Sequence, residues 1–509
     1  MPERLIFRLL LRGKTLNHEF GDPLRIDAFA VGPGLVGLTI CPGRNSTEWN
    51  YARNLDHDLD VISKWGASAI LTLVEPHELD TMNVRHLGEE AEKRGIRWLH
   101  LPIPDLGAPD ADGLEAWRQI SPSIHQMLDA GGRLLIHCRG GIGRSGLMAA
   151  FVLLERGDDL RTAMATVREV RPGAIETLEQ ERFLARQLSM WNERAEKVRA
   201  SFFGGAIGDS LGAEIEFWPL DAIARRFPGN VDELLPHAGR IGAITDDTQM
   251  TLFTAEGLID AQNAGAAKDT DAVVRHVHHA LLRWFVTQGY PPRIETAERG
   301  LVTDPRLHVR RAPGNTCMSA LNAAERVGIA ATNDSKGCGT IMRVAPVAYA
   351  RGIDQAQVAL STSALTHGHP VGQTAAAAWA CILAEVLAGR EPEDAARKAA
   401  SLFEDETGAA IAKALAAPRN GEAGTVESLG GGWVAEEALA IALYAVLASN
   451  SFEQGVSIAV KHSGDSDSTG AIAGNLLGLL YPDEVMAHRW RREIECADLV
   501  NRLALEIGR

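Results

Sequence analysis

The sequence predicts a chain of two domains, an α/β domain over residues 1–195 followed by an all-α domain over residues 200–509. Three observations lead to this prediction. Short β-rich apolar runs alternate with helix-like segments in the first part. After about residue 200 the strand-like runs nearly vanish and helical periods recur. The length of 509 residues also favours more than one hydrophobic core.

In the first domain, strands are expected over 67–73, 96–101 and 133–137, and helices over 86–94, 113–128, 146–155 and 159–170. A charged amphipathic helix is expected over 177–197. No Pro/Ser-rich linker follows it, so we expect the two domains to be docked against each other. In the second domain, helices are expected over 271–285, 373–388, 393–403 and 435–448, and Gly470, Gly474 and Gly478 predict tight helix packing.

The bulk composition excludes several classes of protein. With 46% hydrophobic and 23% charged residues, the chain resembles an ordinary globular protein. Its net charge of -15 repels nucleic acid and anionic membranes, so neither is an expected partner. The most apolar run, 375–387, contains Glu385 and is too short to span a bilayer. The six cysteines form no Cys-x-x-Cys pair, which predicts reduced thiols and a cytoplasmic location.

The segment after the third expected strand, residues 137–145, has the sequence His-Cys-Arg-Gly-Gly-Ile-Gly-Arg-Ser. Glycines let backbone N–H groups turn inward and a helix N-terminus adds positive potential, so this loop can cradle a phosphate dianion. The same field favours a thiolate nucleophile at Cys138. Arg144 can grip phosphate oxygens bidentately, and Ser145 can donate a hydrogen bond to the sulfur when it leaves. The cradle itself consists of Arg139, Gly140, Gly141, Ile142 and Gly143.

Two other interpretations compete for this loop. Gly141-x-Gly143-x-x-Gly146 matches a dinucleotide-binding fingerprint, but that fold needs an acid at the end of the next strand, and 159–170 has a helical pattern. A lone buried cysteine is usually inert packing. The full spacing from His137 to Ser145, between a strand and a helix, favours the phosphate cradle.

With two further motifs, 102–110 and 173–180, residues 38–184 resemble the dual-specificity branch of the cysteine-dependent protein phosphatases, and within it the cyclin-dependent-kinase-associated phosphatase. The resemblance implies that Cys138 attacks phosphorus while Asp105 protonates the leaving oxygen. Asp105 then activates water to hydrolyse the phosphocysteine. Gln180 is implied to position that water, and no cofactor is implied. Asp110 is a rival acid, although an ordinary loop carboxylate is the favoured interpretation.

Two acidic clusters lie in the second domain, Thr245-Asp246-Asp247-Thr248 and Gly464-Asp465-Ser466-Asp467-Ser468-Thr469. Together they offer only oxygen ligands, which suit Mg²⁺ or Mn²⁺ and not zinc. On the residues alone, two surface acidic turns that cap helices explain the pattern equally well.

Residues 201–482 resemble the ADP-ribosylglycohydrolases in five motifs that occur in the family's order, at 204–212 with Glu216, 245–248, 337–346, 366–367 and 464–470. The resemblance implies two Mg²⁺ ions, or Mn²⁺, held by Thr245, Asp246, Asp247, Asp465, Asp467 and Ser468. Such ions would bind the ribose hydroxyls beside a carbon that becomes oxocarbenium-like.

The same resemblance assigns further roles. Glu216 falls at the family's mobile acidic residue and is expected to be catalytic, acting on the leaving group or gating the site. Asp209 is expected to orient the ligands. Gly337, Gly339 and Thr340 are expected to line the diphosphate. His367 is expected to face the ribose or adenine, or equally to be a core histidine, and Cys338 is expected to be a packing residue.

These features predict a bifunctional hydrolase that removes phosphate and ADP-ribose from modified proteins or from a related small molecule. A narrower version has one ADP-ribosyl phosphate meeting both sites. A different class, a binding protein in which one domain reads a mark without cleaving it, remains an alternative.

Overall fold

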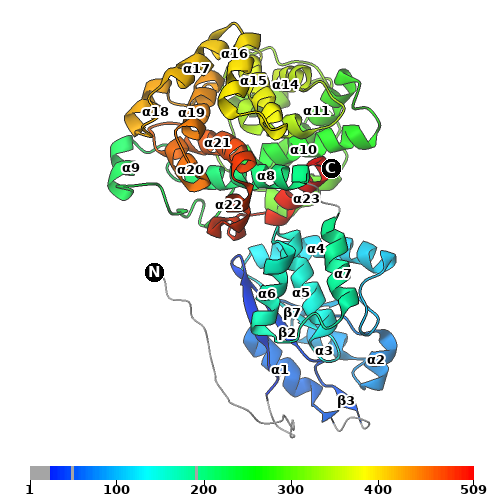
Figure 1. The fold of residues 1–509 in the computed structure, drawn as a ribbon. Coiled ribbons are helices and arrows are strands. Elements are labelled where there is room, and N and C mark those ends of the chain that lie inside the picture. Colours follow the sequence, from blue (N-terminus) through cyan, green and yellow to red (C-terminus); the bar gives the residue numbers. More distant parts are fainter. Residues whose placement is uncertain (1–22, 47–50, 190–192, 509) are drawn as a thin grey trace.

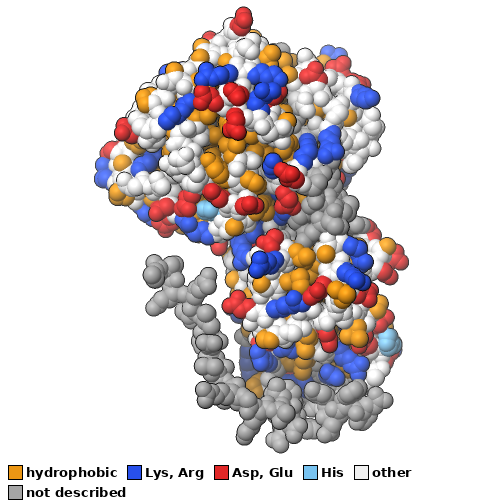
Figure 2. Space-filling view, in the orientation of Figure 1, with side chains coloured by type: hydrophobic (Ala, Val, Ile, Leu, Met, Phe, Trp, Pro, Cys, Tyr) orange, Lys and Arg blue, Asp and Glu red, His pale blue; other side chains and the backbone are white. Residues whose placement is uncertain are grey.

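The computed structural model describes residues 23–46, 51–189 and 193–508, which form two lobes in contact with each other (Figure 1). The first lobe is the predicted α/β domain and the second is the predicted all-α domain. Acidic and basic side chains are interspersed over the face of both lobes that Figure 2 shows.

A five-stranded sheet in the order β1-β2-β7-β5-β6 forms the centre of the first lobe. Its strands are β1 (Asp27–Val31), β2 (Gly34–Thr39), β5 (Ala69–Thr72), β6 (Arg97–His100) and β7 (Arg133–His137), and β3 (Asn45–Ser46) pairs separately with β4 (Tyr51–Ala52). β1 is antiparallel to β2, and the other pairs are parallel. The central strand β7 is buried at its last four residues, because a parallel strand is covered on both faces.

Helices cover both faces of this sheet. One face packs on α1 (Leu55–Trp65) and α3 (Leu87–Lys93). The other packs on α4 (Ala111–Asp129), α5 (Gly143–Glu155), α6 (Leu160–Val170) and α7 (Leu178–Ser189), and α2 (Pro76–Thr81) lies after β5. The three predicted strands and the predicted helices before residue 171 are confirmed, each within a few residues of its expected ends.

In its described residues the second lobe consists of helices and the loops that connect them, and its only β-structure is a pair of isolated β-bridges. Its helices are α8 (Glu193–Gly212), α9 (Leu220–Arg226), α10 (Asp246–Asn263), α11 (Thr270–Thr287), α12 (Asn315–Ala323), α13 (Ala345–Tyr349), α14 (Gln355–Ala364), α15 (Pro370–Leu387), α16 (Pro392–Leu402), α17 (Glu406–Ala416), α18 (Ala423–Leu429), α19 (Ala435–Leu447), α20 (Phe452–Val460), α21 (Ser466–Leu480), α22 (Pro482–Ala487) and α23 (Ala497–Gly508). Short 3₁₀ turns are η1 (Gly300–Thr303), η2 (Pro305–Leu307), η3 (Ile341–Arg343) and η4 (Arg489–Arg492).

Helices α8 and α21 pack against each other through glycines on both partners. A Cβ added at Gly208 would lie 2.0 Å from the Gly470 carbonyl oxygen, and one at Gly204 would lie 2.3 Å from that of Gly474. Such contacts are impossible for any residue with a side chain, so the two backbones touch directly. The predicted tight packing of Gly470, Gly474 and Gly478 is therefore confirmed. It brings the end of α8 against the acidic start of α21, where a Cβ at Gly212 would lie 2.3 Å from the Ser466 carbonyl oxygen.

Two segments bear on predicted boundaries. The amphipathic helix expected over 177–197 corresponds to α7 and the start of α8, and residues 190–192 lie outside the described part. α8 itself runs through the expected join at 195–200.

α15 is the one helix in the described ranges that is long and apolar enough to cross a membrane, and 61% of its apolar window is buried in the protein.

Candidate functional sites

The predicted phosphate loop links the carboxyl end of β7 to the first turn of α5. The Gly141 N–H donates to the Cys138 Sγ at 3.2 Å, and the Ser145 Oγ lies 3.5 Å from the same sulfur. α5 begins at Gly143, and the residue before it, Ile142, has no polar side-chain atom to cap the helix. The free N–H groups of that first turn can therefore bind an anion next to the sulfur.

The backbone of the loop is held by a close contact of Gly141 with β2 and by hydrogen bonds from Arg171. Gly141 has φ +67°, and a Cβ there would lie 2.4 Å from the Thr39 carbonyl oxygen of β2. Arg171 donates to the Gly141 and Gly140 carbonyl oxygens at 2.9 and 3.3 Å and pairs with Asp27 at 2.6 Å. With the carbonyl oxygens held outward in this way, the N–H groups are left to line the cradle.

Arg144 is buried and is held by groups that sequence reasoning did not identify. Its guanidinium donates to both Glu78 carboxylate oxygens at 2.6 and 2.9 Å and to the Ile103 carbonyl oxygen at 2.9 Å. Burial alone would lower the pKa of Arg144, but the hydrogen bonds to Glu78 outweigh it and raise the pKa. No local motif around Glu78 points to this contact, because its partner lies far along the chain.

The predicted general acid, Asp105, lies at the same site. Its carboxylate is 2.9 Å from Arg144 Nη2, and its side chain is 52% exposed, so a bound phosphate ester could reach it. Asp110 instead accepts the Gly113 N–H at 2.8 Å and caps α4, as the favoured interpretation of it predicted. Gln180 is buried and donates to the Gly107 carbonyl oxygen at 3.1 Å, and a Cβ at Gly143 would touch its amide.

The two acidic clusters also meet, although they lie far apart in the sequence. Thr245 is the N-cap of α10, which begins with Asp246 and Asp247. Asp465 precedes α21, and Asp467 and Ser468 lie in its first turn. Carboxylate oxygens of Glu216, Asp465 and Asp467 lie within 4.8 Å of one another. The aspartates of both clusters are buried. Burial, and then the charges of Asp246, Asp209 and Asp465, raise the pKa of Asp247 well above its usual range, so the first cluster lies close to the second. The alternative of two separate surface turns is therefore wrong.

The electrostatics of this acidic cluster fit a divalent cation. Burial and then the neighbouring carboxylates Asp465, Asp246 and Asp209 raise the pKa of Glu216 to about 8. Burial, with smaller contributions from Asp209 and Asp465, raises the pKa of Asp246 to about 8. The Asp247 Oδ1 is buried and finds no hydrogen-bond partner among the described residues. An orphaned buried carboxylate oxygen among repelling acids is the environment that a hard cation relieves.

Asp209, on α8, orients the first acidic turn. Its carboxylate accepts the Thr245 and Thr248 N–H groups at 3.0 and 3.2 Å and the Thr248 hydroxyl at 2.5 Å.

Cys338, predicted to be a packing residue, contacts the second acidic cluster directly. Its thiol donates to the Asp465 carboxylate at 2.8 Å, and the Ser468 hydroxyl lies 3.7 Å from its sulfur.

The residues expected at the diphosphate lie beside the acidic cluster. A Cβ at Gly337 or Gly339 would lie 3.3 or 3.0 Å from the His367 ring, so this loop and the histidine are in contact. Burial, followed by Arg343, lowers the pKa of His367 to about 3, and the ring is therefore neutral. Thr340 is fully buried, and its hydroxyl donates to the Gly372 carbonyl oxygen at 2.7 Å.

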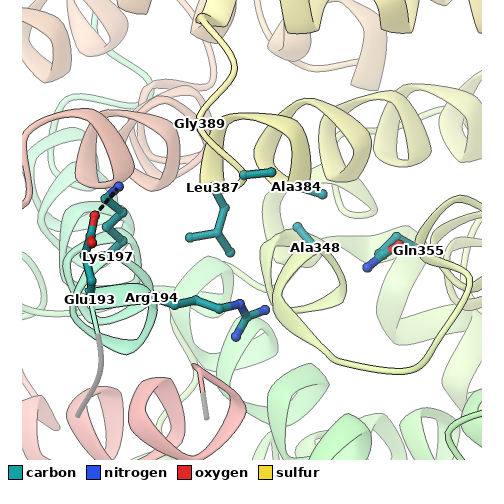
Figure 3. Close-up of a pocket in the computed structure, with 9 residues that line it drawn as sticks. Glu193, Arg194, Lys197, Ala348, Gln355, Ala384, Leu387 and Gly389 are labelled. Atoms are coloured by element: carbon teal, nitrogen blue, oxygen red, sulfur yellow. Dashed lines mark ion pairs between the residues drawn. The ribbon is translucent and has the colours of Figure 1, made fainter.

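A cavity of about 680 Å³ lies elsewhere, between the start of α8 and the end of α15 (Figure 3). Its lining includes Arg194, Gln355 and Leu387, and Lys197 pairs there with Glu193 at 3.1 Å. Neither acidic cluster nor the phosphate loop contributes to this lining.

Comparison with known proteins finds two different families along the chain. The ADP-ribosylglycohydrolase family matches residues 190–509, and a family described as a DSP-PTPase phosphatase of polymorphic toxin systems matches residues 47–158. Cyclin-dependent kinase inhibitor 3 of Rattus norvegicus is 33% identical over 152 residues, which cover 29% of this chain and 69% of that protein.

Two further relatives match the second part. ADP-ribosylarginine hydrolase Tri1 of Pseudomonas putida is 25% identical over 322 residues, covering 61% of this chain and 78% of that protein. A solved structure described as an ADP-ribosylglycohydrolase-related protein complex is 25% identical, with a TM-score of 0.44, and the match covers 62% of this chain and 98% of that one.

Proposed function

The chain belongs to the ADP-ribosylglycohydrolase family and carries a dual-specificity phosphatase domain in front of it, and from this premise we propose a bifunctional hydrolase that removes phosphate at Cys138 and ADP-ribose at the acidic cluster. The single observation that carries the proposal is that both sets of reactive residues converge. Arg144 interacts electrostatically with Cys138 and pairs with Asp105 at 2.9 Å in one lobe, and carboxylates of Glu216, Asp465 and Asp467 meet in the other.

At the phosphatase site, the Cys138 sulfur attacks phosphorus and the phosphorus–oxygen bond to the leaving group breaks. Asp105 supplies the proton that the leaving oxygen needs. In the second step, Asp105 takes a proton from water, the water oxygen bonds to phosphorus and the thiolate leaves, helped by the Ser145 hydroxyl. Arg144, fixed by Glu78, holds the phosphate oxygens throughout.

At the acidic cluster, the residues suited to hold divalent cations are Thr245, Asp246, Asp247, Asp465, Asp467 and Ser468. When bound, Mg²⁺ or Mn²⁺ would supply Lewis-acid charge at the ribose. Asp209 keeps the first acidic turn in position. Burial and the neighbouring carboxylates raise the pKa of Glu216 above its usual range, and its carboxyl oxygen can pass a proton to the leaving group.

Several points support separate reactions on modified proteins. α5 has 13 residues, and its far end, not the phosphate loop, contacts the second lobe. At 1.5 Å per residue it separates Cys138 from that contact by roughly 20 Å, so one small molecule is not expected to span both sites.

Catalysis by Cys138 needs a reduced thiol, which favours a cytoplasmic location.

The test uses wild-type protein, Cys138→Ser and Asp246→Ala with two assays. p-Nitrophenyl phosphate reports the first site, and ADP-ribose release from ADP-ribosylated peptides at fixed Mg²⁺ reports the second. We expect each variant to lose its own activity and to keep the other. Loss of both activities in either variant would contradict independent sites, and tight ADP-ribose binding without any turnover would favour a reader of the mark.

A further inference from the structure

A short segment of the second lobe, residues 240–245, runs from the interface between the lobes to the first acidic turn. At its start, Arg240 donates through Nη1 to the Asp129 carbonyl oxygen at 2.6 Å, at the end of α4 in the first lobe. Its Nη2 also lies 3.5 Å from the Asp129 carboxylate. At its end, Thr245 caps α10, which begins with Asp246. Because an extended chain spans at most about 3.6 Å per residue, the contact with the first lobe lies within roughly 20 Å of the acidic turn.

The middle of this segment is held by a buried ion pair between Arg311 and Glu495. The Ile244 N–H donates to the Glu495 carboxylate at 3.3 Å, and the Ile244 carbonyl oxygen accepts from Arg311 Nη1 at 2.6 Å. Arg240 Nε lies 3.9 Å from the same Glu495 carboxylate. Glu495 therefore connects the arginine at the lobe interface to the peptide group that precedes Thr245.

The segment is also fixed at its two flanks. Gly242 has φ +70°, and a Cβ there would lie 2.1 Å from the Glu493 carbonyl oxygen, so the backbones touch. On the other flank, the Gly314 N–H donates to the Asp246 carboxylate at 3.3 Å. Groups that orient metal ligands act strongly on metal affinity, and losing one typically costs about 10–100-fold. The packing of residues 240–245 is therefore expected to act on cation binding at the turn that follows.

An ion pair between lobes ordinarily serves only to dock them, and the chain offers a comparison for that role. Arg492 also pairs with an acid of the first lobe, Asp158, at 3.0 Å, through a side chain that is 44% exposed. Within the described part of the chain, the Arg492 side chain forms no hydrogen bond or ion pair with residues 240–245. Arg240 and Arg492 thus both cross between the lobes, but only Arg240 begins the segment that leads to the acids.

We propose that Asp129 and Arg240 are positioning residues for the first acidic turn, so that the phosphatase lobe completes the ADP-ribosylglycohydrolase site. This inference rests on the proposed hydrolase function and gives the first lobe a role that does not depend on Cys138. The docked lobe holds residues 240–245 in the conformation that keeps Thr245 and Asp246 beside the acids of α21. The two reactions remain separate in their chemistry, and the second requires the first lobe to be in place.

The test compares full-length wild-type protein with Arg240→Ala, the conservative Arg240→Lys and Asp129→Asn, and Arg492→Ala is the matched control. Arg240→Ala leaves Asp129 paired with Arg156 and Arg306 at 3.0 and 2.8 Å, so it strands no buried charge and should fold. Calorimetry measures the Kd of Mg²⁺, and amide hydrogen exchange without metal follows residues 240–247. ADP-ribose release from ADP-ribosylated peptides is measured over a range of Mg²⁺ concentrations, with p-nitrophenyl phosphate turnover beside it.

We expect Arg240→Ala and Asp129→Asn to raise the Kd of Mg²⁺ by about fivefold or more, and Arg240→Lys and Arg492→Ala to stay within about twofold of wild type. ADP-ribose release by Arg240→Ala should fall at low Mg²⁺ and recover at saturating Mg²⁺, because the acids themselves are intact. Its p-nitrophenyl phosphate turnover should not change. Residues 240–247 should exchange their amide hydrogens faster in Arg240→Ala than in Arg492→Ala.

Three results would overturn the proposal. The first is an equal rise in the Mg²⁺ Kd in Arg240→Ala and Arg492→Ala, which would assign the effect to docking in general. The second is an unchanged Kd in both. The third is full additivity of Asp129→Asn and Arg240→Ala in the double variant, since residues that act through one contact are not additive.

Failure of the proposed function would look different. If the wild type binds Mg²⁺ but releases no ADP-ribose, the hydrolase function falls, and the comparison of Mg²⁺ Kd values still decides whether Arg240 positions the turn. If the wild type binds no Mg²⁺, the metal site and the positioning role fall together.

Discussion

Glu78 fixes the arginine that is to bind phosphate. Its carboxylate spans both terminal nitrogens of Arg144 at 2.6 and 2.9 Å, in a buried environment. We expect Glu78→Gln to lower kcat/KM on p-nitrophenyl phosphate by at least about tenfold, because the guanidinium loses its charged partner and its fixed orientation. Glu89→Gln, on the exposed side of α3, is the control. Activity within twofold of wild type would show that Glu78 does not position Arg144.

The acidic cluster should couple metal binding to protons. Glu216 and Asp246 have folded-state pKa values raised to about 8, mainly by burial. For a carboxyl with a raised pKa, the folded state without metal holds the proton more tightly than the unfolded state. Its stability therefore falls as pH rises from about 4 through 8.

Because the carboxyls hold their protons at low pH, protons compete there with the metal. We therefore expect Mg²⁺ to raise the Tm more at pH 8.5 than at pH 5.5. Thermal melts in EDTA and in Mg²⁺ at several pH values check this. Asp467→Asn, which removes one of the clustered carboxylates, should shrink the shift. An equal Mg²⁺ effect at both pH values would contradict the assignment.

At the scale of elements, the contact between α8 and α21 places Asp209, which holds the first acidic turn, and Glu216 beside the acids of α21. Ala at Gly208 would place a methyl group 2.0 Å from the Gly470 carbonyl oxygen, so the helices would have to separate. We expect Gly208→Ala to destabilise the second lobe by about 1–3 kcal/mol, the usual cost of overpacking, and to weaken Mg²⁺ binding.

Urea unfolding followed by circular dichroism measures the change at Gly208. Gly424, in α18, is a matched control, because a Cβ there would meet nothing within 4 Å. Gly424→Ala should be neutral or stabilising by up to about 1 kcal/mol. If the two substitutions have the same effect, close packing of α8 on α21 is not what positions the acids.

The elements that the sequence predicts correctly are those whose defining residues are neighbours in the sequence. The segment from β7 through Cys138 to α5 has an apolar strand, a glycine loop and a helix in sequence order, so each part predicts the next. The spacing of Gly470 and Gly474 likewise predicts a close contact between helices.

The contacts that sequence reasoning missed are long-range. No sequence spacing predicts the contact of Arg171 with the phosphate loop. The same holds for the contact of Glu78 with Arg144 and for that of Trp433 with Phe217. Cys338, expected to be a packing residue, also has no pattern that points to the acidic cluster, and only the fold brings its thiol to Asp465. The antiparallel hairpin of β1 and β2 was also missed, since its strands are short and rich in Gly and Ala.

At the scale of the whole molecule, buried ion pairs join the two lobes. Arg491 of η4 pairs with Asp158 at 2.5 Å and donates to the Arg156 carbonyl oxygen at 3.0 Å, just beyond the end of α5. Arg306 bridges Asp129 of α4 to Asp498 of α23 at 2.8 and 2.7 Å. Burial would raise the pKa of Asp129, but Arg156 and Arg306 outweigh it and hold the pKa low.

Removing one partner of such a pair leaves a charge buried without compensation, at a cost of about 3–5 kcal/mol. We therefore expect Arg491→Ala to split the calorimetric unfolding of the protein into two transitions, because the lobes would no longer stabilise each other. Arg489→Ala, in the same turn, removes an exposed pair with Glu453 and should cost less than about 1 kcal/mol. A single transition at an unchanged Tm in Arg491→Ala would mean that the lobes are held together mainly by their apolar contacts.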